Sequence, residues 1–182
     1  RSLVALLLLL TAAGYANSFP GSFIWDDTPL IVENPLVSSP DLLAIFSTDY
    51  CGQSANCGTY RPLTTMTYVL NRALIGPGAA SFHAVNVALH AAVTVILFLF
   101  LETMGFGAAV SWLAAALFAV HPIHTEAVNL ATNRAEIMAA LGVLLALWLA
   151  VRRPRGHLAL ILIAYISALL SQETGLVFLL LL

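Results

Sequence analysis

The stretch His121–Glu136 reads HPIHTEAVNLATNRAE and is the only long polar interruption in the second half of this sequence. Apolar runs of Ala, Leu, Val and Ile flank it on both sides. Ionisable side chains this close to a lipid bilayer are costly, and chains retain them mainly where they have a function. The stretch therefore indicates a functional site at a membrane surface and separates two membrane-embedded parts of the chain.

The composition supports a membrane location. Hydrophobic residues make up 60% of the chain and charged residues only 9%, whereas a soluble domain carries about 25% charged residues. The cations are seven arginines, with no lysine, and the formal net charge is −2. Because nucleic-acid binding needs a basic surface, this charge balance excludes nucleic acid as an expected partner.

Six apolar segments are predicted to form membrane helices: 2–16, 81–101, 108–120, 137–151, 158–170 and 176–182. A full crossing takes about 20 residues, so the last segment is an incomplete span. We therefore expect an all-α integral membrane protein and interpret residues 1–182 as the N-terminal part of a longer chain. Segment 2–16 also fits a cleaved signal peptide.

A polar segment, Asn17–Gly78, follows the first apolar segment and contains two predicted short helices. One begins at Ser39 as N-cap, with proline at the first helical position; the other covers 62–74. Amphipathic helices of this kind lie along the membrane surface. Cys51 and Cys57 in the same loop could form a disulfide in an oxidising compartment or remain free.

The orientation in the membrane follows from the arginines. The turn 152–155 holds three of them, and the positive-inside rule makes that turn cytoplasmic. Alternation then places the polar segments 17–78, 121–136 and 171–175 on the outer side. Three segments far apart in the sequence are thus predicted to meet at one membrane face.

Two charged motifs of the first loop are candidate site residues. The adjacent carboxylates Asp26 and Asp27 could supply a general base or metal ligands, or could simply form a solvated turn. Arg61 precedes the helix over 62–74, and its planar guanidinium suits bidentate phosphate binding. A cation that only anchors the helix at the interface is the competing interpretation of Arg61.

Further polar residues are expected to face this site. Three of them share one face of the helix over 81–101 and must point into the bundle, as site residues or as interhelical hydrogen-bonding groups: His83, Asn86 and His90. A permissible metal ligand set is also present: His121, His124 and Glu126. The HExxH arrangement is missing, and we predict no metal site.

Three more polar residues belong to this set: Arg134, Glu136 and Glu173. The set predicts an outward-facing pocket for a substrate with a lipid part and a phosphate-sugar part. Two alternatives stay open. A secondary transporter could relay protons through Glu126, Glu136 and Glu173, and a membrane scaffold could serve a soluble domain elsewhere in the protein.

Several motifs occur in a recognisable order: Phe23–Asp27 (FIWDD), Ile31–Pro35 (IVENP), Tyr60–Thr64 (YRPLT), Phe82–Asn86 (FHAVN) with His90, Phe118–Val128 (FAVHPIHTEAV), Asn133–Glu136 (NRAE) and Ser171–Gly175 (SQETG). With them the chain resembles the transmembrane, tetratricopeptide-repeat-containing O-mannosyltransferase family and its bacterial relatives, over nearly its whole length. The resemblance implies a GT-C fold, a multi-span helical glycosyltransferase in the bacterial inner membrane or the endoplasmic reticulum membrane. Its active site would face the periplasm or the lumen. Tetratricopeptide repeats would follow, and these 182 residues contain none.

The resemblance also implies a reaction, the transfer of a sugar from a polyprenyl-phosphate donor (dolichyl phosphate mannose in eukaryotic members) to a protein Ser or Thr hydroxyl. Asp26 and Asp27 match the catalytic acid pair, one acting as base and the other as an orienting group. We assign donor phosphate and sugar binding to one set: Arg61, His121, His124, Glu126, Arg134, Glu136 and Glu173. The pocket lining is assigned to another: Trp25, His83, Asn86 and His90. No cofactor besides the lipid-linked donor is predicted.

Two features depart from the family pattern. Gln172 stands where a lysine is expected before Glu173, which puts a phosphate contact at that position in doubt. The Cys51–Cys57 loop is not part of the pattern, and we expect it to affect only loop stability.

Overall fold

The computed structural model describes residues 2–51, 57–152 and 156–181, and within them every regular element is helical. The longer helices are α1 (Ser2–Gly14), α4 (Pro62–Leu74), α5 (Ala79–Thr103), α6 (Ala108–Val120), α8 (Arg134–Arg152) and α9 (Leu158–Ser171). The short ones are α2 (Pro35–Ser38), α3 (Leu42–Ser47), α7 (Thr125–Asn129) and α10 (Phe178–Leu181). Single-turn 3₁₀ or π segments cover Ala16–Ser18, Thr28–Val32, Pro122–His124, Ala131–Asn133 and Glu173–Val177. The predicted all-α class is confirmed.

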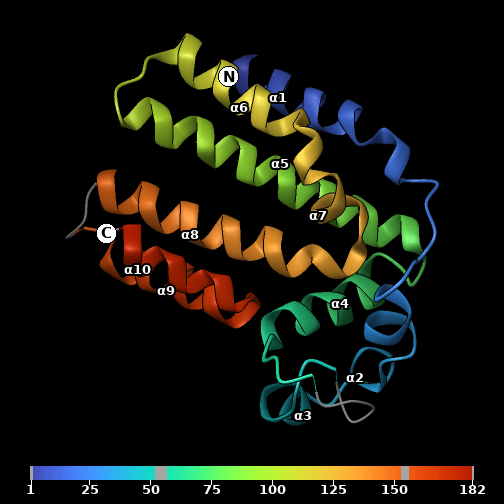
Figure 1. The fold of residues 1–182 in the computed structure, drawn as a ribbon. Coiled ribbons are helices and arrows are strands. Elements are labelled where there is room, and N and C mark those ends of the chain that lie inside the picture. The colour runs from blue at the N-terminus through green and yellow to red at the C-terminus, as the bar shows by residue number, and fades with distance from the viewer. Residues whose placement is uncertain (1, 52–56, 153–155, 182) are drawn as a thin grey trace.

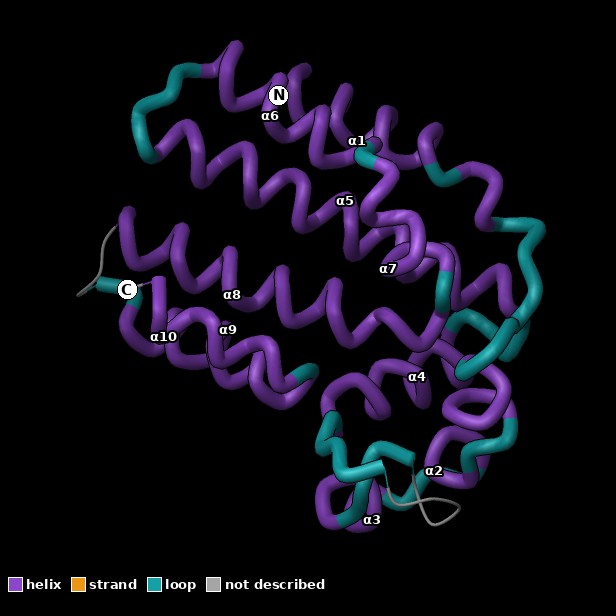
Figure 2. The backbone as a smooth tube through the Cα atoms, viewed as in Figure 1, coloured by secondary structure: helices purple, strands orange, loops and turns teal. Residues whose placement is uncertain are grey.

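The long helices α6, α5, α8 and α9 lie side by side in that order, and α1 packs against both α5 and α6 (Figure 1). The short helices α2 and α3, together with α4, gather at one end of this layer. Loops join the helices at their ends, and several of them lie around α2 and α3 (Figure 2). The first polar loop thus forms a cap over one end of the helix layer.

Two helical stretches are long and apolar enough to cross a membrane: α5 and Ala131–Arg152. Helix α6 and the stretch Pro122–Asn129, bent by 46° at the break between them, together make a third candidate span. Helices α1 and α9 have only 13 and 14 residues, fewer than the roughly 20 of a full crossing. The helices predicted over 2–16 and 158–170 are therefore present, but their crossing of the membrane stays a prediction.

Helices α8 and α9 approach closely because Gly142 has no side chain. A Cβ atom at this position would lie 2.7 Å from the Ala164 carbonyl oxygen and 2.9 Å from the Ala168 Cβ. Small residues of this kind let helix backbones come together where lipid provides little hydrophobic driving force. Buried side chains such as Val143 and Phe178 complete this part of the core.

The first loop matches its prediction in part. Helix α4 has the predicted bounds, but the N-cap of α3 is Asp41, not Ser39. The Asp41 carboxylate accepts hydrogen bonds from the amides of Leu43 and Ala44, which a serine two residues earlier cannot reach. The predicted disulfide joins Cys51 to Cys57, whereas residues 52–56 between them lie outside the described residues, as do residues 153–155 of the arginine-rich turn.

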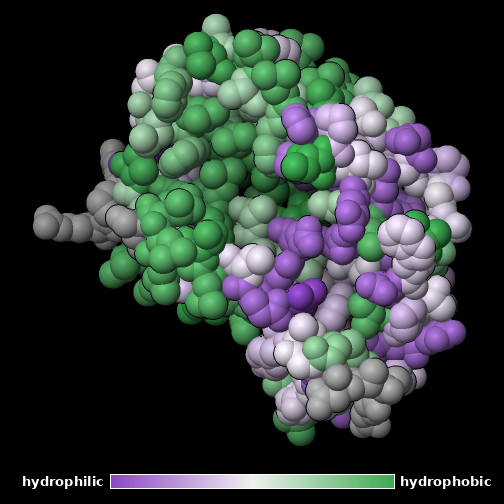
Figure 3. All heavy atoms as spheres, in the orientation of Figure 1, coloured by the Kyte–Doolittle hydropathy of each residue, from purple (hydrophilic) through white to green (hydrophobic). Residues whose placement is uncertain are grey.

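Polar side chains gather at the end of the molecule that holds α4 and α7, while apolar side chains cover the opposite half (Figure 3). The three polar segments meet there through hydrogen bonds. Thr132 donates to Asp27, Arg61 pairs with Glu173, and the Thr64 hydroxyl donates to the Ser171 carbonyl at 2.9 Å. The predicted convergence of the three segments is confirmed, and the side of the membrane that they face remains a prediction.

Candidate active site at the polar end

Asp27 connects the first loop to the segment that precedes α8. Its side chain is fully buried, and one carboxylate oxygen accepts from both the amide (2.9 Å) and the hydroxyl (3.0 Å) of Thr132. The other oxygen accepts from the Ile24 amide at 3.2 Å. A carboxylate satisfied in this way by its own chain holds the turn together, so the geometry gives Asp27 a positioning role.

Asp26 has the opposite environment. Its side chain is exposed and lines a pocket of about 370 Å³, called here the outer-loop pocket, with Pro29, Leu30, Tyr50, Cys51, Cys57, Thr59 and Arg61. The residue before it, Trp25, has a φ of 47°, an outlier for a bulky side chain. Trp25 is 77% exposed and lies outside the lining of this pocket, unlike the prediction made for it.

The cation of the outer-loop pocket is Arg61. Its Nε and Nη2 atoms donate to one oxygen of Glu173 at 3.2 and 2.9 Å, and its guanidinium lies 5.3 Å from the centre of the Tyr50 ring. Partial burial raises the pKa of Glu173, but the hydrogen bond and the charge of Arg61 outweigh it and lower the pKa below its ordinary value. The Glu173 carboxylate is therefore ionised at neutral pH.

Two buried tyrosines pair at this pocket, Tyr50 in its lining and Tyr68 outside it. The hydroxyl groups of Tyr50 and Tyr68 are 3.0 Å apart, and that of Tyr68 donates to the Thr132 carbonyl at 2.9 Å. Burial raises the pKa of Tyr50 to about 12 and the pKa of Tyr68 well above its ordinary value. Both phenols remain protonated, so they act as fixed hydrogen-bonding groups and not as bases.

Arg134 lies in the interior instead of the pocket. The side chain is fully buried, between the rings of Tyr68 and Phe82, with the guanidinium carbon 5.0 and 5.1 Å from their centres. Its hydrogen-bond acceptors are neutral: Asn86 Oδ1 at 2.9 Å, Asn71 Oδ1 at 2.8 Å, and the carbonyl oxygens of Phe82 at 3.2 Å and Thr67 at 3.3 Å. Through these contacts the cation ties α4, α5 and α8 together.

Three other predicted site residues line a second cavity of about 200 Å³, called here the histidine cavity. His90, His124 and Glu136 line it, together with Phe118. His121 and Glu126 are exposed next to it in sequence and do not line it. Among the described residues Asp26 and Arg61 line one cavity, and His90, His124 and Glu136 line another, in place of one shared pocket. His124 follows the break after α6, and its ring packs against those of His90 and Phe118.

The three polar residues on one face of α5 point inward, as predicted. His83, Asn86 and His90 are all buried, but each has a different neighbourhood. Asn86 donates to the Leu130 carbonyl at 2.9 Å and accepts from Arg134, which favours the structural interpretation. His90 contacts the carbonyl of Ala119 through Nε2 at 3.1 Å and stacks on Phe118.

Comparison with known proteins adds independent information. The chain is 36% identical over 179 residues to a protein O-mannosyl-transferase of Caenorhabditis elegans, covering 94% of this chain and 26% of that protein. It is 40% identical over 149 residues to the human protein O-mannosyl-transferase TMTC1, covering 78% of this chain and 17% of the relative. It is 38% identical over 146 residues to TMTC3 of Mus musculus, covering 75% and 15%.

The chain is homologous to part of the protein O-mannosyl-transferases. It spans about a quarter or less of the length of these curated relatives. No protein-family model and no solved structure matches it significantly. The homology agrees with the family resemblance of the sequence motifs.

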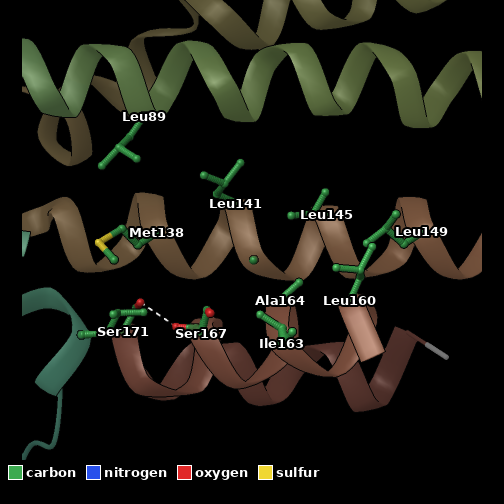
Figure 4. A pocket seen from close by; sticks show the side chains of 12 residues that line it. Leu89, Met138, Leu141, Leu145, Leu149, Leu160, Ile163, Ala164, Ser167 and Ser171 are labelled. Atoms are coloured by element: carbon green, nitrogen blue, oxygen red, sulfur yellow. Dashed lines mark hydrogen bonds between the residues drawn. The ribbon is translucent and has the colours of Figure 1, made fainter. Parts of the chain in front are cut away.

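A third cavity of this O-mannosyl-transferase homologue is apolar and lies apart from the two polar ones. A groove of about 400 Å³ runs between α5, α8 and α9, and leucine side chains such as Leu89, Leu141 and Leu160 line it (Figure 4). The lining residues are all uncharged, and Ser171 lies at the end nearest the outer-loop pocket. Without a titratable group the groove offers no acid, base or phosphate ligand.

Sequence reasoning missed Tyr50, Tyr68, Thr132 and Asn71 as residues that build this site. All four lie in or next to segments that were singled out, but no spacing rule connects them. The one available signal is chemical: tyrosines in a polar loop and in an amphipathic helix can bury a ring and still satisfy a hydroxyl.

Proposed function

We propose that the protein transfers mannose from a polyprenyl-phosphate donor to a Ser or Thr hydroxyl of an acceptor protein. The reaction takes place at the outer-loop pocket, on the lumenal or periplasmic side of a multi-span membrane domain. One observation carries the proposal: the exposed carboxylate of Asp26 and the cation of Arg61 line the same pocket, in a chain homologous to protein O-mannosyl-transferases.

In the proposed reaction the acceptor hydroxyl oxygen attacks the anomeric carbon of the sugar. Its proton passes to the Asp26 carboxylate, which acts as general base. The bond from the anomeric carbon to the phosphate oxygen breaks, and the electron pair leaves on the polyprenyl phosphate. Arg61 binds the phosphate and stabilises the negative charge that develops there.

Asp27 and Glu173 support the proposed base, Asp26, and the phosphate-binding cation, Arg61. Asp27 fixes the turn that presents Asp26, because it is held by Thr132 and Ile24. Glu173 keeps Arg61 in place until the donor phosphate replaces or joins it.

His124 and Glu136, which line the histidine cavity, are proposed to contact the donor away from its phosphate. No metal or other cofactor is part of the proposal.

The experiment compares three variants of the full-length protein in membranes, with polyprenyl-phosphate mannose as donor and Ser/Thr peptides as acceptors. Asp26→Asn should lower the rate of transfer by 10²-fold or more, the range of about 10²–10⁴ that a general base contributes. The matched control is Glu33→Gln, an exposed carboxylate of the same loop, which should transfer like the wild type.

Asp27→Asn separates the two carboxylates. The amide substitution removes a charged acceptor from a buried site, so it should lower the amount of folded protein as well as the rate. Equal transfer by the wild type and by Asp26→Asn would exclude Asp26 as the base. Absence of transfer by the wild type with any lipid-linked sugar would refute the proposed function.

A further inference from the structure

A continuous series of contacts joins the acid turn to the cation of the outer-loop pocket. Asp27 accepts from Thr132, the Thr132 carbonyl accepts from Tyr68, and the hydroxyls of Tyr68 and Tyr50 are bonded to each other. The ring of Tyr50 then lies against the Arg61 guanidinium. The Asp27 turn, which presents the proposed base Asp26, is thus connected to the Arg61 cation by one series of contacts.

Tyr50 is the member of this series that touches Arg61. Its side chain is 4% exposed, and its backbone amide donates to the Thr59 carbonyl at 2.8 Å. This backbone bond fixes the chain two residues before Arg61. The Tyr50 ring therefore cannot move away from Arg61 without breaking either the hydroxyl pair or the backbone pair.

The ring and Glu173 restrain different parts of Arg61. Glu173 accepts from Nε and Nη2, and among the described residues no hydrogen bond engages Nη1. A cation over a tyrosine face is attracted by the ring quadrupole and held at a set distance from it. The Nη1 group therefore keeps its donors for a ligand, while the Glu173 and Tyr50 contacts restrain the guanidinium.

We propose that Tyr50 is a positioning residue for the donor phosphate. Its ring face holds the Arg61 guanidinium in place for the phosphate, and its hydroxyl, bonded to Tyr68, is the weaker of its two restraints. This inference rests on the proposed function, because it takes Arg61 as the phosphate ligand.

The ring face and the hydroxyl can be tested separately in the full-length protein in membranes, with polyprenyl-phosphate mannose as the varied substrate. Tyr50→Leu removes the ring face and should raise the KM for the donor about fivefold, the effect of one cation–π contact, with kcat nearly unchanged. Tyr50→Phe keeps the face and should restore the KM to within about twofold, since only one neutral hydrogen bond is lost.

The neighbouring Tyr60 provides the matched control. It is half exposed, and its hydroxyl donates to the Phe46 carbonyl at 2.9 Å, with no ring contact to Arg61 among the described residues. Tyr60→Leu should leave the KM for the donor unchanged. In an Arg61→Gln background, Tyr50→Leu should add no further increase in KM, because the two residues act through one contact.

The outcomes distinguish the inference from the proposed function. Transfer by the wild type with an equal KM in Tyr50→Leu would overturn the positioning role alone. The same holds for a fall in kcat without a rise in KM, or for failure of Tyr50→Phe to restore the KM. If the wild type transfers no sugar, the proposed function and this inference fall together.

Discussion

The buried Arg134 provides the most direct test of how the polar end is held together. Substituting it with lysine keeps the charge but replaces a planar group with five donors by a point charge with three. Five acceptor atoms contact the guanidinium, and two rings cover it. We expect Arg134→Lys to leave at least one buried acceptor without a donor and to lose the stacking on Tyr68 and Phe82.

The expected cost follows from these contacts. An unsatisfied buried polar group costs about 1–3 kcal/mol, and a desolvated cation–π contact contributes up to about 2 kcal/mol. The free energy of unfolding should therefore fall by about 2–4 kcal/mol, a large share of the stability of a typical domain.

The assay is thermal unfolding of the purified full-length protein in detergent or lipid nanodiscs. The matched control is Arg72→Lys. Arg72 lies on α4, the helix that Arg134 contacts, but its side chain is exposed. Arg134→Lys should unfold at a clearly lower temperature, and Arg72→Lys at that of the wild type. Equal unfolding temperatures for the two variants would refute the structural role assigned to Arg134.

Two further predictions concern the ion pair and the helix contact. Because Arg61 lowers the pKa of Glu173, the pair stabilises the fold above the unfolded pKa of about 4.3 and loses that contribution as the pH falls through the folded pKa. Wild type and Glu173→Gln should then differ by at most about 1 kcal/mol at pH 7 and converge near pH 3, as chemical unfolding at both pH values would show; a difference that grows in acid would contradict this sign. Gly142→Ala should destabilise the α8–α9 contact by about 1–3 kcal/mol, because its Cβ would lie 2.7 Å from a backbone oxygen. Helix propensity alone favours alanine by about 1 kcal/mol, so a gain in thermal stability would show that the two helices are not closely packed.

Local pattern in the sequence determined the helices of this protein. The apolar segments 81–101 and 108–120 and the amphipathic 62–74 correspond to α5, α6 and α4 within two residues at each end. Their lengths and periodicities are properties of neighbouring residues, which a hydrophobic pattern records directly. The inward direction of His83, Asn86 and His90 follows in the same way from helical spacing and the cost of polar groups in lipid.

Only the tertiary structure decided which polar side chains are exposed at a pocket and which are bound within the protein. Asp26 and Asp27 are adjacent and identical in type, yet one is exposed and the other is bound by Thr132, a residue 105 positions away. Arg61 and Arg134 look equally suited to a phosphate, but one pairs with Glu173 and the other is enclosed by Asn71 and Asn86. These differences depend on contacts between distant segments, and the direction of a side chain in a turn depends on backbone angles that residue type alone leaves open.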